Sequence, residues 1–243
     1  MDVSMQIEPN LHNPPFADAP TVAFRDASQG DALRVARKIG GSWQISGVDG
    51  PSDTRSGVSL AFDSSAGLTV AYFQGFDTGA PAIREPLKLA RELPSDVTDT
   101  RPPDFDSQVI DKDFVAAESV SMASGLLGPA LIAYADRKSR TVHAWVNELS
   151  GEPPRIEVVA GGNVTNGPRH PSAAGNPHQN LFVAYLDNGQ VVLARRSTLT
   201  SEWTSQPVAT GDGWPSLEFG KDGTAHLAYG TGKLMYARSA TPA

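Results

Sequence analysis

The sequence predicts an all-β protein, a single five-bladed β-propeller with four-stranded blades. Three observations predict this fold. A short apolar motif ending in alanine and an aromatic residue occurs five times, a serine precedes every copy, and turn residues separate the strand-like runs. The recurrent alanines are Ala23, Ala71, Ala133, Ala184 and Ala228. Their spacing is near the roughly 40–50 residues of a propeller blade, with one longer interval.

Each repeat contains the same order of predicted strands. The first strand carries the serine, in Val3–Glu8, Val58–Asp63, Val120–Gly125, Pro171–Gly175 and Pro215–Gly220. The alanine motif forms the second, in Thr21–Asp26, Thr69–Gln74, Leu131–Asp136, Phe182–Asp187 and His226–Thr231. The third is Leu33–Lys38, Leu87–Glu92, Val142–Asn147, Val191–Arg196 and Leu234–Ser239. The fourth occurs in four repeats, as Trp43–Val48, Phe105–Ile110, Arg155–Val159 and Trp203–Val208.

These repeats predict one domain over residues 1–243, with blades at about 3–50, 57–111, 118–160, 170–210 and 214–240. The last blade lacks its outer strand, which would leave Leu234–Ser239 as an exposed edge. Three arrangements remain open. Blade five packs directly on blade one, or Val3–Glu8 is the missing outer strand instead of the inner strand of blade one, or a partner chain covers the edge.

Composition excludes several classes of function. The 20 basic and 27 acidic residues give a net charge of -7, which is not the charge of a nucleic-acid-binding protein. No apolar run reaches the roughly 20 residues of a membrane span. The chain has no cysteine, so it has no disulfide and no thiolate metal ligand. We expect no metal and no cofactor. The opening "MDVSMQIEPN" has no signal-peptide pattern, which leaves a cytoplasmic protein or an exported one whose signal was removed.

Two segments resemble the repeats of bacterial sialidase-like propellers, the group related to BNR or Asp-box repeats. They are Ser59–Tyr72 followed by Leu87–Ala90, and Ser216–Tyr229 followed by "KLMYA". The resemblance implies the propeller fold over nearly the whole chain. It departs from catalytic sialidases, because the strict Ser-x-Asp-x-Gly-x-Thr-Trp box, the arginine triad and the Tyr/Glu nucleophile pair are not found.

Candidate ligand-binding residues lie where a propeller places its central channel mouth. Loops between blades and loops between the second and third strands share that face, so residues at their ends are expected to surround the mouth. These residues are Arg55, Glu118, Arg169, Trp214, Asp26 and Gln74. The loop Gly75–Pro86 is longer than a hairpin turn requires and is a candidate lid.

Candidate catalytic residues are Asp136, Asp187 and His170, and they apply only if the protein is an enzyme. Carboxylates grouped with a histidine could perform acid–base chemistry. The alternative is that each aspartate, Asp26 included, accepts hydrogen bonds within its own turn. Recurrence favours the turn interpretation, since every blade needs turn residues whereas a catalytic residue is needed once.

The sequence therefore predicts a ligand-binding propeller, lectin-like in function, that recognises a glycan or a polar small molecule at the channel mouth or between blades. The first alternative is an enzyme, either a glycoside hydrolase or a lyase or isomerase. In that case Arg55 and Arg169 would hold an anionic group. The second alternative is a protein–protein interaction scaffold that uses the enlarged loop of blade two. The oligomeric state is not predicted.

Overall fold

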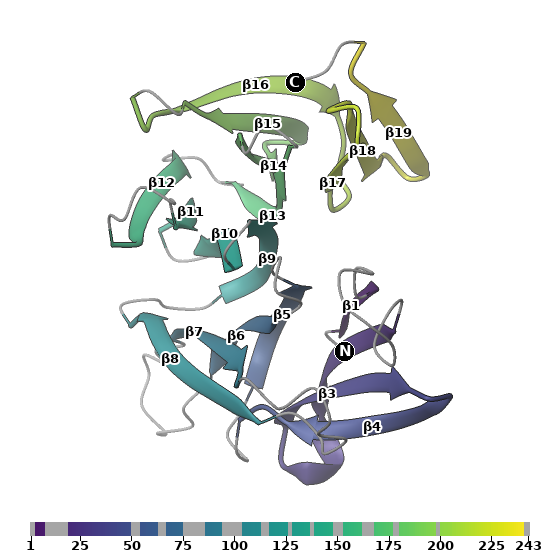
Figure 1. Ribbon diagram of the computed structural model, residues 1–243. Helices are drawn as coiled ribbons and strands as arrows, with labels where there is room; N and C mark the ends of the chain where they lie inside the picture. The colour runs from purple at the N-terminus through teal and green to yellow at the C-terminus, as the bar shows by residue number, and fades with distance from the viewer. Residues whose placement is uncertain are drawn as a thin grey trace. The chain divides into compact units, whose positions relative to one another are not determined.

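The computed structural model describes residues 3–7, 19–49, 54–62, 67–74, 86–93, 104–112, 117–125, 128–136, 139–147, 153–161, 168–176, 180–197 and 200–240. The chain forms two compact units. Unit 1 comprises residues 1–116 and 126–129, and unit 2 comprises residues 117–125 and 130–243. The described residues form antiparallel strands and one short 3₁₀ turn, Ala27–Gln29, so the fold is all-β (Figure 1).

Unit 1 contains two four-stranded sheets, each with its strands in chain order. Sheet A consists of β1 (Val3–Ile7), β2 (Pro20–Asp26), β3 (Ala32–Ile39) and β4 (Ser42–Gly47). Sheet B consists of β5 (Thr54–Phe62), β6 (Leu68–Gln74), β7 (Leu87–Glu92) and β8 (Phe105–Asp111). Because β1 pairs with β2, Val3–Ile7 is the inner strand of sheet A. The alternative that this segment is the outer strand of the last repeat was therefore wrong.

Unit 2 contains three sheets. Sheet C consists of β9 (Ala117–Gly125), β10 (Gly128–Asp136), β11 (Thr141–Val146) and β12 (Arg155–Gly161). Sheet D consists of β13 (Arg169–Gly175), β14 (Leu181–Asp187), β15 (Gln190–Arg196) and β16 (Trp203–Thr210). Sheet E consists of β17 (Ser216–Phe219), β18 (Ala225–Gly230) and β19 (Leu234–Arg238), with no fourth strand among the described residues. The five sheets correspond to the five predicted repeats.

The inner strands begin earlier than the sequence predicted. β5, β9 and β13 start at Thr54, Ala117 and Arg169, inside segments that were expected to be loops between blades. The added residues of β5 and β13 are possible because the register shifts, between Thr54 and Val58 and again between Arg169 and Ser172. Such bulges lengthen one strand locally and redirect its side chains.

The recurrent serines join the inner strands of neighbouring sheets. Ser4 Oγ accepts a hydrogen bond from the backbone N–H of Leu60 (3.1 Å). Ser121 Oγ accepts one from Ala173 (2.9 Å), and Ser172 Oγ accepts one from Leu217 (2.9 Å). In each case the donor is the residue that follows the serine of the next sheet. The hydroxyl thus satisfies an inner-strand amide that would otherwise lack a partner.

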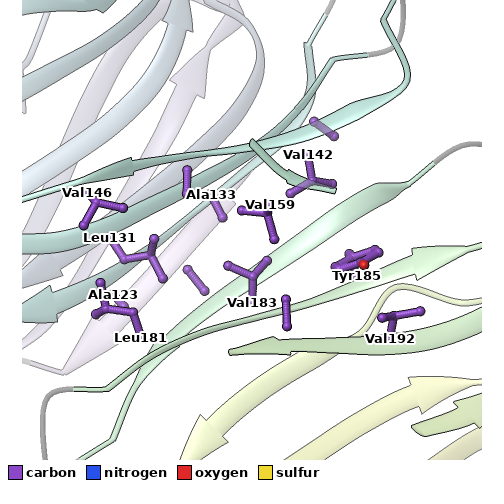
Figure 2. Packing of buried hydrophobic residues seen from close by; sticks show 14 residues of the cluster. Ala123, Leu131, Ala133, Val142, Val146, Val159, Leu181, Val183, Tyr185 and Val192 are labelled. Carbon is purple, nitrogen blue, oxygen red and sulfur yellow. The ribbon is translucent and has the colours of Figure 1, made fainter. Parts of the chain in front are cut away.

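Apolar side chains fill the space between the sheets of each unit. Between sheets C and D, Leu131 and Ala133 of β10 and Val183 of β14 belong to one buried cluster (Figure 2). The alanines of the repeated motif are fully buried at Ala133 and Ala184. A larger residue at either position would meet the facing sheet, because protein interiors are close-packed. The small residue of the motif is therefore set by the closeness of the sheets.

Buried ion pairs also cross from sheet to sheet. In unit 1, Arg37 of β3 donates two hydrogen bonds to the carboxylate of Glu92 in β7 (3.0 and 2.8 Å). In unit 2, Arg196 of β15 donates two to Glu157 of β12 (2.8 Å each), and Trp203 Nε1 donates a third (2.8 Å). The Arg196 side chain is only 3% exposed. These carboxylates therefore compensate guanidinium charges that water barely reaches.

Ser172→Ala should lower the free energy of unfolding by roughly 1–3 kcal/mol, because it leaves the buried N–H of Leu217 without its acceptor. Denaturant titration of the purified protein measures the change. Ser216→Ala is the matched control, since Ser216 occupies the same repeat position but is exposed, and it should stay within about 0.5 kcal/mol of the parent. Equal effects of the two substitutions would contradict the proposed role of the hydroxyl.

Glu157→Gln should destabilise the protein by about 3 kcal/mol at neutral pH, because Arg196 then remains buried without a carboxylate. Burial raises the pKa of the Glu157 carboxyl, but hydrogen bonds from Arg196, Arg155 and Trp203 outweigh it, so the net pKa is lowered from its ordinary 4.5.

The sign of the pH effect follows from that lowered pKa. The stabilisation is complete above pH 4.5 and is lost as the pH falls through the native pKa. Urea midpoints measured on both sides of pH 4.5 should therefore converge for parent and variant in acid. Glu202→Gln, at an exposed position of the same unit, is the control. A pH-independent difference would contradict the assignment.

Candidate functional site

An aromatic pair lies where sheets D and E meet, at the start of their inner strands. The imidazole of His170 stacks on the indole of Trp214, with ring centroids 4.3 Å apart and planes inclined by 16°. Trp214 is 65% exposed. Stacked rings hold each other in place, and a fixed, exposed indole offers a flat apolar surface to a ligand. We call His170 and Trp214 the aromatic platform.

The two residues of the platform occupy the same repeat position. Each stands two residues before the recurrent serine of its sheet, as Gly57 does in sheet B. His170 has a φ of 53° and Gly57 a φ of 64°. A non-glycine residue in this left-handed region is strained by roughly 1 kcal/mol or more. At Gly57 and His170 the backbone therefore favours glycine, and His170 keeps a side chain there despite the strain.

Glycines bring the loop of Trp214 against the end of β18. The amides of Asp212 and Gly213 both donate to the carbonyl of Gly230 (2.9 and 3.3 Å). A Cβ atom added to Gly213 would lie 2.7 Å from the Cα of Gly230. Only glycine allows this approach, so the loop has one position relative to β18 and Trp214 is held at the surface.

Two charged candidates, Arg169 and Asp187, belong to sheet D together with His170. Arg169 is the first residue of β13 and is exposed, so its guanidinium can contact an anionic or hydroxyl-rich ligand. Asp187 ends β14 in the same sheet and accepts a hydrogen bond from Asn188 Nδ2 (3.2 Å). Burial raises the pKa of the Asp187 carboxyl.

The other two aspartates, like Asp187, accept hydrogen bonds within their own hairpins. Asp26 accepts hydrogen bonds from the N–H (3.0 Å) and hydroxyl (2.6 Å) of Ser28, and these hydrogen bonds lower its pKa. Asp136 accepts one from the Ser139 hydroxyl (2.7 Å). This is the geometry that the turn interpretation requires. The structure brings together His170 and Trp214 among the candidates, whereas these contacts tie Asp26 and Asp136 to their turns.

Of the remaining candidates, only Gln74 has a described side chain. Gln74 ends β6 and is buried, with 7% exposure. Arg55 and Glu118 lie in β5 and β9, and their side chains are outside the described part of the chain. The same holds for residues 75–85 of the candidate lid, so the interaction scaffold that depends on this loop stays a prediction.

The sequence analysis missed a polar cluster in unit 1. The carboxylate of Asp49, two residues beyond the end of β4, accepts hydrogen bonds from the Tyr72 hydroxyl (2.6 Å) and from Lys88 Nζ (2.7 Å). Burial and the neighbouring Asp49 raise the pKa of Tyr72. Because Tyr72 is completely buried, the cluster joins sheets A and B and does not present a reactive hydroxyl. A lysine inside the otherwise apolar segment Leu87–Ala90 was the available signal.

Two further findings concern the described residues. No group of three or more histidine or carboxylate side chains among them is arranged to hold a metal ion. No helix in that part of the chain is long and apolar enough to cross a membrane.

Comparison with known proteins supports the fold. No protein-family model matches the chain, and no curated protein matches it. Among solved structures, it is similar to a protein of unknown function from Dyadobacter fermentans (TM-score 0.60, 13% identity), a match that covers 97% of this chain and 77% of that one. It is also similar to a luciferin-regenerating enzyme (TM-score 0.52, 15% identity; 92% and 69% covered).

These relatives are β-propeller-like proteins, and the chain described here has the same fold class. At such low identity the likeness concerns the fold and does not extend to a ligand or a reaction. The prediction of an all-β propeller with four-stranded blades is confirmed. The exact number of blades and the single-domain assignment stay predictions.

Asp187→Asn should increase the free energy of unfolding at pH 7. The raised native pKa means that the folded protein holds the proton more tightly than the unfolded chain, so ionisation opposes folding as the pH rises. The gain should vanish near pH 3, where the carboxyl is protonated in both states. Thermal unfolding at the two pH values measures it, with the exposed Asp212→Asn as control. A loss of stability at pH 7 would show that the ionised carboxylate supports its turn.

Proposed function

We propose that this protein is a ligand-binding β-propeller that recognises a glycan or another polar small molecule on the aromatic platform of unit 2. One observation carries the proposal. An indole that is 65% exposed is held flat against an imidazole at the junction of two sheets. Sugars present apolar C–H faces that stack on aromatic rings, while their hydroxyls need hydrogen-bonding groups nearby.

The surroundings of the platform supply such groups. His170 contributes an imidazole and Arg169 an exposed guanidinium, and both belong to β13. Arg169 can bind a carboxylate or phosphate through two parallel hydrogen bonds, which favours ligands that carry an acidic group. The strained backbone of His170 supports a functional reason for its side chain, because glycine would fit the same position without strain. The sialidase-like repeat signature makes glycans the first ligand class to test.

The second candidate is an enzyme, and the raised pKa of Asp187 favours it. A carboxyl that stays protonated above its ordinary range can act as a general acid, with His170 as the base. Such an enzyme would be a glycoside hydrolase or a lyase or isomerase. Asp136 belongs to the same set, and like Asp187 it accepts a hydrogen bond within its own turn. Turnover of a bound ligand, abolished by Asp187→Asn without loss of binding, would support this candidate over the lectin-like one.

Trp214→Ala should weaken binding of a ligand found by glycan-array screening by at least roughly tenfold, which corresponds to about 1.4 kcal/mol. The fold should persist, since only the stacking on His170 is lost, at most about 1.5 kcal/mol. Isothermal titration measures the dissociation constant, and circular dichroism follows the melting temperature.

Two further variants sharpen this test. Trp43→Ala removes an indole that is 50% exposed in sheet A and should leave binding unchanged. His170→Asn keeps a residue that tolerates positive φ and removes the imidazole, so it should weaken binding without unfolding the protein. Full binding by Trp214→Ala would refute the platform as the site.

A further inference from the structure

A chain of hydrogen bonds on sheet C links an aspartate to a histidine that the proposed function does not use. Ser139 Oγ donates to the carboxylate of Asp136 (2.7 Å). The hydroxyls of Ser139 and Thr141 are hydrogen-bonded to each other, and Thr141 Oγ1 lies 2.6 Å from Nε2 of His143. We call these four residues the hydroxyl relay.

The antiparallel register of β10 and β11 places the relay on one face of the sheet. Asp136 pairs with Thr141, and Tyr134 pairs with His143. The two pairs are neighbours on the same face, because residues two apart in a strand point to the same side. The imidazole stacks on the fully buried Tyr134, with ring centroids 5.5 Å apart. On β12 the residue opposite His143 is Val158, which carries no charge. Within sheet C, the relay thus connects this ring to a carboxylate.

The hydrogen atoms of the relay can be assigned from its carboxylate end. An ionised carboxylate only accepts hydrogen bonds, and a hydroxyl has one hydrogen to donate. Ser139 donates its hydrogen to Asp136, so it must accept from Thr141. Thr141 has then used its own hydrogen, so it must accept from Nε2 of His143. Nε2 therefore bears a hydrogen whether the ring is neutral or charged.

We propose that the carboxylate of Asp136 fixes the Nε2–H tautomer of His143 through the hydroxyl relay, which makes Nδ1 the basic nitrogen of the neutral ring. In catalytic triads a carboxylate bonded directly to an imidazole has this effect, and an amide in its place allows the wrong tautomer. Here two hydroxyls transmit the same orientation over a longer path. Asp136 is thus a positioning residue for His143.

Sheet A contains a simpler form of the same arrangement. Arg34 occupies the position in its repeat that His143 occupies in sheet C. Arg34 Nε lies 3.0 Å from the carboxylate of Asp26, the aspartate that corresponds to Asp136. A basic side chain is therefore linked to the hairpin aspartate in both sheets. The long guanidinium side chain reaches its carboxylate directly, whereas the shorter imidazole is linked through two hydroxyls.

The tautomer bears on the enzyme candidate, although the inference depends neither on the proposed ligand nor on catalysis. Nδ1 of His143 is buried. A proton that this nitrogen accepts can leave the ring on the other side, since Nε2 gives its hydrogen to Thr141, Thr141 to Ser139, and Ser139 to Asp136. The imidazolium then becomes neutral as the carboxylate becomes an acid, which releases the proton to water. This route requires the hydrogen on Nε2.

NMR of isotopically labelled imidazole nitrogens measures the tautomer, because a nitrogen that bears hydrogen and a bare nitrogen give separate signals. The chain has five histidines, and His143→Gln identifies the signals of His143 by their loss. At the alkaline end of its titration, the ring in the parent should hold the Nε2–H form in about tenfold excess, the ratio that one hydrogen bond supports. An even mixture, or a parent in the Nδ1–H form, would overturn the inference.

Two substitutions separate the relay from the other surroundings of the ring. Ser139→Ala interrupts the relay and lets the Thr141 hydroxyl donate to Nε2, so the ratio should move about tenfold toward the Nδ1–H form. Asp136→Asn should move it in the same direction, because an amide can donate as well as accept. Ser28→Ala removes the hydroxyl bonded to Asp26 in sheet A and is the control. If both relay variants kept the tautomer of the parent, the carboxylate would not be what fixes it, and the inference would be wrong.

Discussion

The hydrogen bond from an inner-strand N–H to the serine of the preceding sheet is the constraint on which the remaining structure depends. An inner strand next to another sheet has amides that no strand of its own sheet can satisfy. A serine hydroxyl fits because it is small and can accept at short range. Once Ser121 and Ser172 hold β9, β13 and β17 side by side, the sheets behind them approach closely. The space between the sheets is then too narrow for side chains larger than the alanines of the second strand. The aromatic residues fill the wider parts of that space.

Much of the fold could be predicted because the same pattern of strands occurs five times in the sequence. The order of the strands and the inner position of the strand that carries the serine follow from comparing the five repeats. No single repeat would have been enough to predict them. The starts of β5 and β13 could not be predicted, since a bulge depends on how two strands pair and leaves little trace in composition. The role of the serines could also be predicted only in part. The sequence shows that the serine recurs in every repeat, but its bond to the next sheet appears only when two sheets are present.

The site shows the same division. His170 and Trp214 could each be named as loop-end residues, yet their stacking depends on Gly213 lying against Gly230, two residues that look like ordinary turn glycines in sequence. Asp49 and Glu157 were missed because their partners are distant along the chain. Lys88, 39 positions from Asp49, and Arg196, 39 positions from Glu157, are recognisable only as charges inside apolar strands. A charged residue at a repeat position that is otherwise buried therefore indicates an ion pair with a partner elsewhere in the chain.

The two buried arginine–carboxylate pairs run in opposite directions along the chain. In unit 1 the arginine belongs to the earlier sheet, and in unit 2 it belongs to the later one. Repeats as similar as these could exchange neighbours during folding, since their apolar faces and serines are nearly equivalent. A misplaced sheet would bury Arg37 or Arg196 against a neighbour that has no carboxylate at that position. Within each unit, one pair of neighbouring sheets is thus matched by charge as well as by apolar packing.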